Sequence, residues 1–209
     1  TELVINIPES RTWSVNLLKA YIDDSKVIKE KYKKRFFANI SFTKSNREVC
    51  QLPAKVRISG DWKDHIQSKK GDVISSLDVT LTEGNINGIT KFKLFIPSTR
   101  NGSSEVILSL LMKEMGYLSP RTKMVKLRLN DKSFEMIFQE KAAKEMLENN
   151  KLRESAILEA DESLMWKIRS DTSPGPFQSS NGNIYPRVVN KKWIKRNSIN
   201  QGIGLEGSK

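Results

Sequence analysis

Apolar and polar residues alternate along short stretches of the chain, which is the period of half-buried β-strands. In the clearest stretch, Phe36, Ala38, Ile40 and Phe42 alternate with more polar neighbours. The same pattern predicts strands at 3–7, 55–58, 77–81, 92–96, 125–129 and 134–138. Turn-rich segments after residues 82 and 129 indicate that the last four of these strands form two hairpins.

Helical spacing replaces the alternation between the two hairpins. Apolar residues recur there at Ile107, Leu110, Leu111 and Met115. Ser103 or Ser104 suits the N-terminal cap of this helix, and Gly116 suits its left-handed C-terminal position. Similar patterns predict helices at 13–22, 141–149 and 162–169, and a short strand at 156–159.

The order of these elements predicts an α+β fold, in which an antiparallel sheet packs against helices. We expect an N-terminal β/α extension at residues 1–50 and the main ordered region at residues 51–172. Loop-forming residues follow Thr172. Residues 173–209 are therefore interpreted as a linker, or as the truncated start of a further lobe.

Composition restricts the class of protein and of partner. The 209 residues carry a net charge of +12, concentrated at 26–35 and 173–209, and basic patches attract phosphate in nucleic acids, nucleotides or lipid headgroups. A solvated face with a flexible tail explains the same charge. No stretch approaches the roughly 20 apolar residues of a membrane span. The single cysteine, Cys50, excludes an internal disulfide and weakly favours a reducing compartment.

Standard catalytic and cofactor signatures are absent from the sequence. One histidine and one cysteine do not supply the paired ligands of a structural zinc site, so no metal ligand is assigned. No Gly-x-Ser-x-Gly elbow, Gly-x-Gly-x-x-Gly motif or Walker loop occurs. The candidates that remain are polar residues at the ends of predicted elements, where rigid scaffolds present functional groups. These residues are Asp61, Asp64 and His65 after one strand, Arg100 and Asn101 before the central helix, and Glu140 and Lys141 at the end of a hairpin strand.

Each of these candidates also has a purely structural interpretation. The acids at positions 61 and 64 could hold His65 and nearby backbone amides in a capped loop. Arg100 could pair with Glu105 across the start of the central helix. Glu140 could be an acid that favours the N-terminus of the helix that follows it. The residues alone leave both interpretations open.

Taken in order, six segments resemble the CotH family, the atypical kinases related to spore coat protein H. The resemblance runs from about residue 55 to residue 166, roughly half the chain. It rests on Arg57–His65, Phe92–Asn101, Glu114–Thr122, Phe138–Lys141, Leu147–Asn150 and Arg153–Leu158. Each segment is short, and their shared order and spacing give the likeness its specificity.

The resemblance implies a protein-kinase-like fold, whose small N-terminal lobe binds ATP with Mg²⁺. Residues 51–172 would form that lobe, with Glu140 at the lobe junction beside the adenine. The loop that carries Asp61, Asp64 and His65 would shape the small lobe near the phosphates. The nucleotide-binding candidates on this basis are Glu140, Lys93, Lys91, Glu105 and Arg100.

The chain departs from the family pattern at two strands. The family's Ser-aromatic-Arg-Ile-Lys strand is present with Asp78 and Thr80 at the positions of the basic residues. Lys91 or Lys93 is expected to supply the missing charge from the neighbouring strand. The Gly-x-Tyr that precedes the junction acid is replaced by Glu135–Phe138.

The function expected from the resemblance is the ATP-binding part of an atypical protein kinase, a phosphotransferase, or of a pseudokinase. The family's catalytic Asp and metal-binding residues lie C-terminal to the matched region. We therefore expect this fragment alone to be inactive and a C-terminal lobe to complete it. The chain begins at Thr1 rather than Met, so its natural start is also expected to lie upstream.

A different class of function remains open beside this one. The charge of +12 and aromatic residues expected to be exposed, namely Trp13, Tyr32 and Trp193, suit a non-catalytic module that binds nucleic acid or an anionic glycan. A structural role in a coat or envelope, with no small-molecule ligand, is the third interpretation.

Overall fold

The computed structural model describes residues 2–43, 49–69, 71–161 and 185–206. The chain divides into two compact units, Thr1–Lys141 and Ala142–Lys209, and each is described separately here. No helix in the described ranges is long and apolar enough to cross a bilayer.

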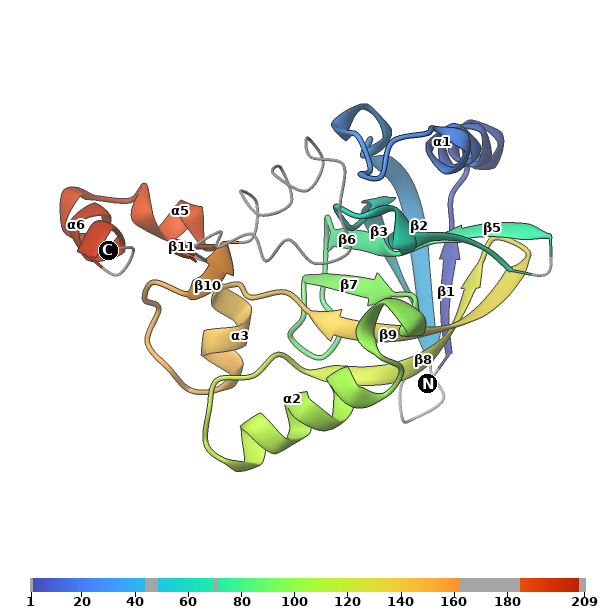
Figure 1. Ribbon diagram of the computed structural model, residues 1–209. Helices are drawn as coiled ribbons and strands as arrows, with labels where there is room; N and C mark the ends of the chain where they lie inside the picture. The colour runs from blue at the N-terminus through green and yellow to red at the C-terminus, as the bar shows by residue number, and fades with distance from the viewer. Residues whose placement is uncertain (1, 44–48, 70, 162–184, 207–209) are drawn as a thin grey trace. The chain divides into compact units, whose positions relative to one another are not determined.

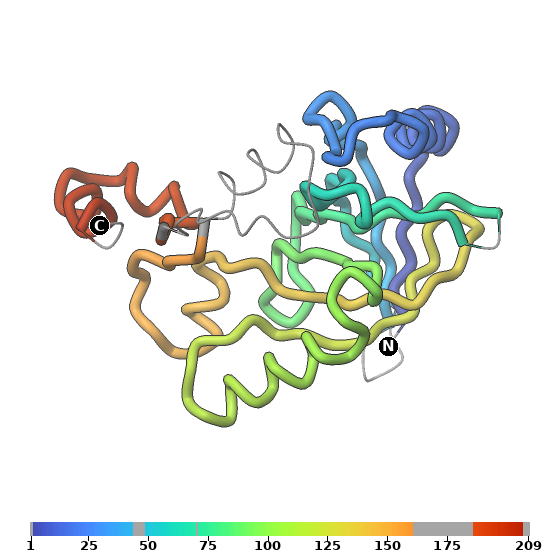
Figure 2. The backbone as a smooth tube through the Cα atoms, viewed as in Figure 1, coloured from blue at the N-terminus to red at the C-terminus, as the bar shows by residue number. Residues whose placement is uncertain are grey.

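A closed β-barrel forms the first unit (Figure 1). Going around it, the seven strands are β1 (Glu2–Asn6), β2 (Phe36–Thr43), β3 (Val49–Ile58), β6 (Leu77–Leu81), β7 (Lys91–Phe95), β9 (Lys132–Glu140) and β8 (Thr122–Leu129). Every neighbouring pair is antiparallel except β1 and β8, which run parallel and close the barrel. Figure 2 follows the chain from β1, in dark blue, to its neighbour β8 further along the chain, in yellow.

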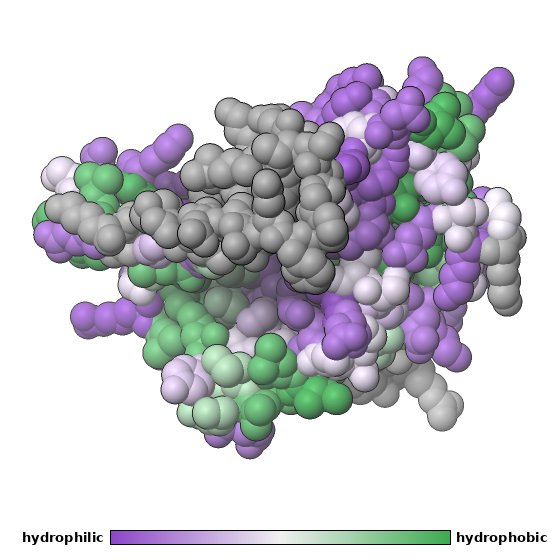
Figure 3. Space-filling view, viewed as in Figure 1, coloured by the Kyte–Doolittle hydropathy of each residue, from purple (hydrophilic) through white to green (hydrophobic). Residues whose placement is uncertain are grey.

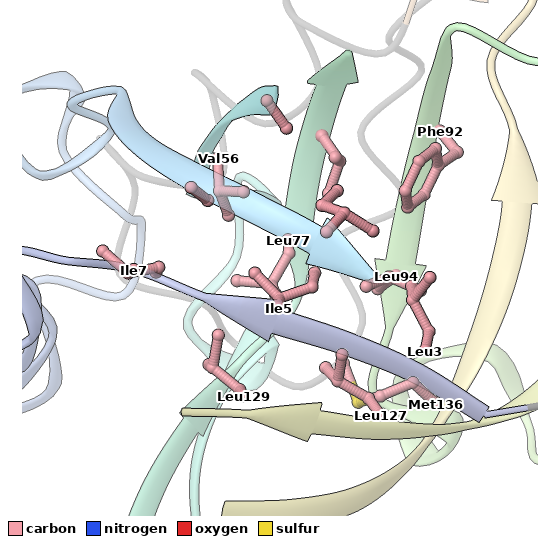
Figure 4. Packing of buried hydrophobic residues seen from close by; sticks show 14 of the residues in the cluster. Leu3, Ile5, Ile7, Val56, Leu77, Phe92, Leu94, Leu127, Leu129 and Met136 are labelled. Atoms are coloured by element: carbon pink, nitrogen blue, oxygen red, sulfur yellow. The ribbon is translucent and has the colours of Figure 1, made fainter. Parts of the chain in front are cut away.

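Alternation along each strand sends one set of side chains into the barrel (Figure 4). The interior is filled mainly by branched aliphatic residues, including Ile5, Val56, Leu77 and Leu94, each of which is fully buried. Phe92 stacks on Phe138 across the same interior, with ring centroids 4.6 Å apart. This single core explains why strands far apart in the sequence form one closed sheet.

The barrel corrects the predicted fold class. An α+β sheet packed with helices, in the form of a kinase-like small lobe, is wrong, because β1 pairs with both β2 and β8 and closes the seven-stranded sheet. Alternation predicts which face of a strand is apolar, but it does not identify the partner strand. A row of inward apolar residues fills a barrel as readily as it faces a helix.

The sequence predicted individual hairpins and helices more accurately than it predicted the fold class. Both predicted hairpins are confirmed, as β6–β7 and β8–β9. The helix predicted between them is confirmed as α2 (Ser104–Glu114), which contacts β8 on the outside of the barrel. A short 3-10 turn, η3 (Pro97–Arg100), leads into this helix from β7.

Smaller elements extend one end of the barrel. Helix α1 (Ser10–Ile22) buries Trp13, Leu17 and Ala20 and contacts β4 (Ile66–Lys69) and β5 (Asp72–Ser75), which pair as a two-stranded sheet. The turns here are η1 (Glu30–Tyr32) and η2 (Lys63–His65). Trp13 of α1 packs edge-on against Phe36 of β2, and this contact packs the helix against the barrel.

The second unit is small. Its elements are α3 (Lys144–Asn149), β10 (Leu158–Asp161), β11 (Tyr185–Val188), α5 (Lys191–Ile194) and α6 (Ser198–Glu206). Strands β10 and β11 pair antiparallel, and Met146, Leu147 and Ile157 form a separate apolar cluster. The predicted helix at 162–169 and the predicted boundary after residue 172 lie outside the described residues.

Candidate functional site

Five polar residues lie side by side across the outside of the barrel. The strand register places Arg57 opposite Asp78, and Asp78 opposite Lys93. The same row continues from Lys93 to Gln139, and from Gln139 to Thr122. The strand neighbours of Arg57, Asp78, Lys93 and Gln139 are buried, so these four side chains point outward, and Thr122 pairs with Gln139 on the same face. We call these five residues the polar row.

Asp78 lies within this row and is almost fully buried, with 1% of its surface exposed. Its Oδ2 accepts hydrogen bonds from Arg57 Nε at 3.2 Å, from Arg57 Nη2 at 3.0 Å and from Lys141 Nζ at 3.0 Å. Burial alone would raise the pKa of Asp78, but Lys141 and Arg57 outweigh it and hold the pKa below its usual value.

The second oxygen of the same carboxylate is the unusual feature. Oδ1 of Asp78 is buried and has no hydrogen-bond partner among the described residues. A buried carboxylate oxygen left without a donor costs free energy, because water no longer solvates it. The site therefore offers a strong acceptor to any donor group that reaches it.

Further basic residues surround Asp78 on the outer face. Thr80 lies two residues after Asp78 on β6. It pairs with Lys55 of β3 on one side and with Lys91 of β7 on the other, which gives a second row parallel to the polar row. The backbone N–H of Lys141 donates to the carbonyl of Lys91 at 3.0 Å, which holds Lys141 at the end of this second row. The face therefore combines one buried acid with several lysines and an arginine.

Arg100 lies over the same face of β7. Its guanidinium stacks on Phe95, 4.2 Å from the ring centroid, and Phe95 follows Lys93 by two residues and so points to the same side. Arg100 Nε is buried and has no hydrogen-bond partner among the described residues. No ion pair joins Arg100 to Glu105, both of which are described; Glu105 instead accepts from Gln139 at 2.6 Å.

His65 holds the loop after β3 through contacts of its ring. His65 Nδ1 lies 2.9 Å from Ser76 Oγ, which also accepts from the Ile96 amide at 3.1 Å. The imidazole packs so closely on Gly60 that a Cβ there would lie 2.3 Å from the ring. Burial lowers the pKa of His65, so the neutral ring is favoured.

The two loop acids point to other partners. Asp61 accepts from Lys33 Nζ at 2.7 Å, and Lys33 also pairs with Glu30 at 2.9 Å. Burial would raise the pKa of Asp61, but the hydrogen bond from Lys33 lowers it below its usual value. Asp64 contributes its backbone carbonyl, which accepts from Gln67 at 2.8 Å. Lys33, which belongs to the basic segment at 26–35, therefore stabilises this loop.

Glu140 lies on the opposite face of the sheet from the polar row. It is the cross-strand neighbour of Phe92, whose ring fills the barrel interior. Arg121 binds both of its carboxylate oxygens, Nε to Oε2 and Nη2 to Oε1, each at 2.8 Å. Of the sequence candidates, the structure therefore brings Lys91, Lys93, Arg100 and Glu105 to the outer face, and Glu140 to a separate buried pair.

Sequence reasoning missed the roles of Asp78, Lys141 and Gln139. The strand from Leu77 to Leu81 alternates, which puts Asp78 on its polar face, and the alternation gives no sign that this acid is buried. Its partner Lys141 is 63 residues away, which no local pattern reveals.

Comparisons of the chain with family models and with curated proteins find no match. In the described ranges there is no group of three or more His, Cys, Asp or Glu residues placed to hold a metal ion. The outer face is therefore characterised by its geometry: a buried acid, an arginine stacked on an aromatic ring, and lysines aligned between them.

Proposed function

We propose that the outer face of the barrel binds a nucleoside triphosphate, with Mg²⁺ carried on its phosphates. The observation that carries the proposal is a pair of buried atoms that have no hydrogen-bond partner within the described ranges, Asp78 Oδ1 and Arg100 Nε, on the face that also presents Lys93. One is an acceptor and the other a donor, so a ligand that satisfies both needs a hydroxyl or amino group and an anionic group. A nucleotide has both.

The lysines support the anionic half of this ligand. Lys93 and Lys91 lie two residues apart on β7, and both therefore point outward. Ammonium and guanidinium groups bind phosphate through charge-assisted hydrogen bonds, which are about twice as strong as neutral ones. We assign the phosphates to Lys93 and Arg100, and a ribose hydroxyl or base amino group to Asp78.

The resemblance to the CotH family, proposed from the sequence, points to the same ligand class. The proposal does not depend on the kinase-like fold that the barrel overturns, because it uses side chains that the strand register places on one face. It is limited to binding, since the groups that support it are binding groups.

Isothermal titration with Mg²⁺–ATP tests the proposal. We expect binding to the 209-residue chain, and at least tenfold weaker binding by Lys93→Gln and by Arg100→Gln. The matched control is Lys126→Gln, which removes one positive charge from an exposed position of β8 outside the polar row. The proposal would be contradicted if no heat of binding is measured at millimolar nucleotide, or if all three variants lose affinity equally.

Binding of a nucleic acid or an anionic glycan loses two of the three aromatic residues that supported it beside the net charge. The expectation that Trp13 and Trp193 are exposed is wrong, since they are 3% and 7% exposed and unable to stack on bases. A fluorescence titration with a single-stranded oligonucleotide or heparin separates this alternative. If either polyanion binds and Lys93→Gln has no more effect than Lys126→Gln, the net charge rather than the polar row is responsible.

A further inference from the structure

The ring of Phe95 lies among three basic side chains. The Arg100 guanidinium stacks 4.2 Å from the ring centroid, and Lys93 Nζ lies 5.5 Å from it. The imidazole of His65 lies 5.9 Å from the same centroid, with its plane tilted by 45°. Phe95 itself is only 1% exposed, so the three groups gather around a buried ring. We call Lys93, Arg100 and His65 the Phe95 cluster.

A buried hydroxyl group fixes the place of His65 in this cluster. Ser76 is fully buried, and its Oγ lies 2.9 Å from His65 Nδ1. The same Oγ accepts a hydrogen bond at 3.1 Å from the amide of Ile96, which lies between β7 and η3. The loop that carries His65 is therefore joined to the segment that carries Lys93 and Arg100.

His65 is the member of the cluster whose charge can change near neutral pH. Burial lowers its pKa, and this effect dominates. The charged groups around the ring act in both directions: Asp64 and Asp61 of its own loop raise the pKa, whereas Arg100 of η3 and Lys93 of β7 lower it. The free chain therefore favours a neutral imidazole beside two permanent cations.

We propose that His65 is the third ligand of the phosphate at the Phe95 cluster, and that it takes up one proton from solvent when the phosphate binds. This inference rests on the nucleotide site proposed above. It adds a residue to that site and names the ligand class as a doubly charged phosphate group. A phosphate beside Lys93 and Arg100 neutralises the two cations that oppose a charge on His65, and it attracts the imidazolium directly.

The contact with Ser76 can hold the ring in both protonation states. A neutral ring accepts at Nδ1 from the hydroxyl of Ser76, and a protonated ring donates from Nδ1 to the hydroxyl oxygen. That oxygen has two lone pairs, so it can accept from the Ile96 amide at the same time. Proton uptake therefore needs a turn of one hydroxyl hydrogen and no movement of the ring.

An NMR titration of the His65 imidazole against pH tests the proposal. The chain has one histidine, so its ring signals are unambiguous. We expect saturating Mg²⁺–ATP to tighten proton binding at His65 about tenfold, a rise of about one in its pKa. Sodium sulfate, which keeps its double charge across the titration, should raise the pKa in the same direction. Sodium chloride at equal ionic strength is the control.

Variants test the cluster without any ligand. Lys93→Gln and Arg100→Gln should each raise the pKa of His65 in the free chain, because each removes a cation beside the ring. The matched control is Lys126→Gln on β8, which should leave the pKa unchanged. An unchanged pKa in all three variants would show that His65 does not sense these cations.

The affinity for Mg²⁺–ATP provides a second measurement, because proton and ligand must favour one another by the same factor. We expect the wild type to bind more tightly at pH 6 than at pH 8, and more steeply so than His65→Gln. The phosphate of the ligand also titrates in this range, but equally for both proteins, so the variant is the reference.

The outcomes separate this inference from the proposed function. Nucleotide binding that leaves the pKa of His65 unchanged would overturn proton uptake and leave the nucleotide site standing. A rise in pKa with sulfate, but no binding of nucleotide, would keep the Phe95 cluster as an anion site and overturn the nucleotide as its ligand. If neither anion binds, both proposals are overturned.

Discussion

Asp78 shows how a single buried charge depends on its partners. Arg57 and Lys141 both donate to its Oδ2, so removing the charge leaves two cations facing a neutral group. Breaking a buried pair in this way is more costly than replacing the whole cluster by apolar residues. The acid is therefore needed by the fold as well as by the proposed ligand.

We predict that Asp78→Asn lowers the free energy of unfolding by about 3 kcal/mol. Urea denaturation measures this loss. The control is Asp72→Asn, which removes an exposed acid paired with Lys132 and should cost less than about 1 kcal/mol. Equal losses in the two variants would contradict the role assigned to Asp78.

Gly60 is required by its close approach to His65 as well as by its backbone angle. Gly60 has φ +105°, and Gly60→Ala would place a methyl group 2.3 Å from the imidazole. We predict a loss of more than about 2 kcal/mol for Gly60→Ala, against about 1 kcal/mol for Gly88→Ala, where φ is +79° but nothing lies within 4 Å. Denaturant titration of both variants separates the steric clash from the backbone strain.

His65 should make the stability of the barrel depend on pH. Burial holds its pKa below the ordinary value of about 6.5, so the unfolded chain binds a proton more readily than the folded one. Stability from this group is complete above the unfolded pKa and is lost as the pH falls through it toward the folded pKa. We predict a falling unfolding free energy from pH 7.5 to pH 5, and a flatter profile for His65→Gln. Identical profiles would show that another group titrates.

At the scale of elements, β1 decides the architecture. It closes the barrel by pairing with both β2 and β8, and its inward residues belong to the common core. We predict that Ile5→Ala costs about 2–5 kcal/mol, because Ile5 is fully buried. Val4→Ala, one residue away on the outer side, should cost under about 1.5 kcal/mol. Urea denaturation compares them, and a similar small loss in both would mean that β1 is not part of the core.

The elements also show which parts of the fold the sequence reveals. Alternation and turn residues predict the β6–β7 and β8–β9 hairpins because each pairs residues close in sequence. The pairing of Glu2 with Lys126 leaves no local trace, so the closed barrel could not be predicted. The residues of the candidate site also differ in whether the sequence reveals them. Arg100 was a candidate from the end of an element and Lys93 from the resemblance to the CotH family, whereas the contact of Asp78 with Lys141 joins residues 63 positions apart.

At the scale of the whole molecule, two outer surfaces of the first unit have opposite character. One carries lysines and arginines around a buried acid, and the other carries the exposed apolar residues of α2 (Figure 3). A net charge of +12 draws anionic ligands to the molecule by long-range attraction, which salt screens. The buried groups of the polar row then provide the specificity that net charge lacks.

The measurement that tests this account most directly is an NMR titration of the ¹⁵N-labelled chain with Mg²⁺–ATP. We predict that the largest amide shift changes centre on Asp78, Lys93 and Arg100, and that β1 and β2 are little affected. The changes should persist at 300 mM salt, because they depend on buried groups. Diffuse changes across all basic surfaces that vanish with salt, or no changes at millimolar nucleotide, would contradict nucleotide binding at the polar row.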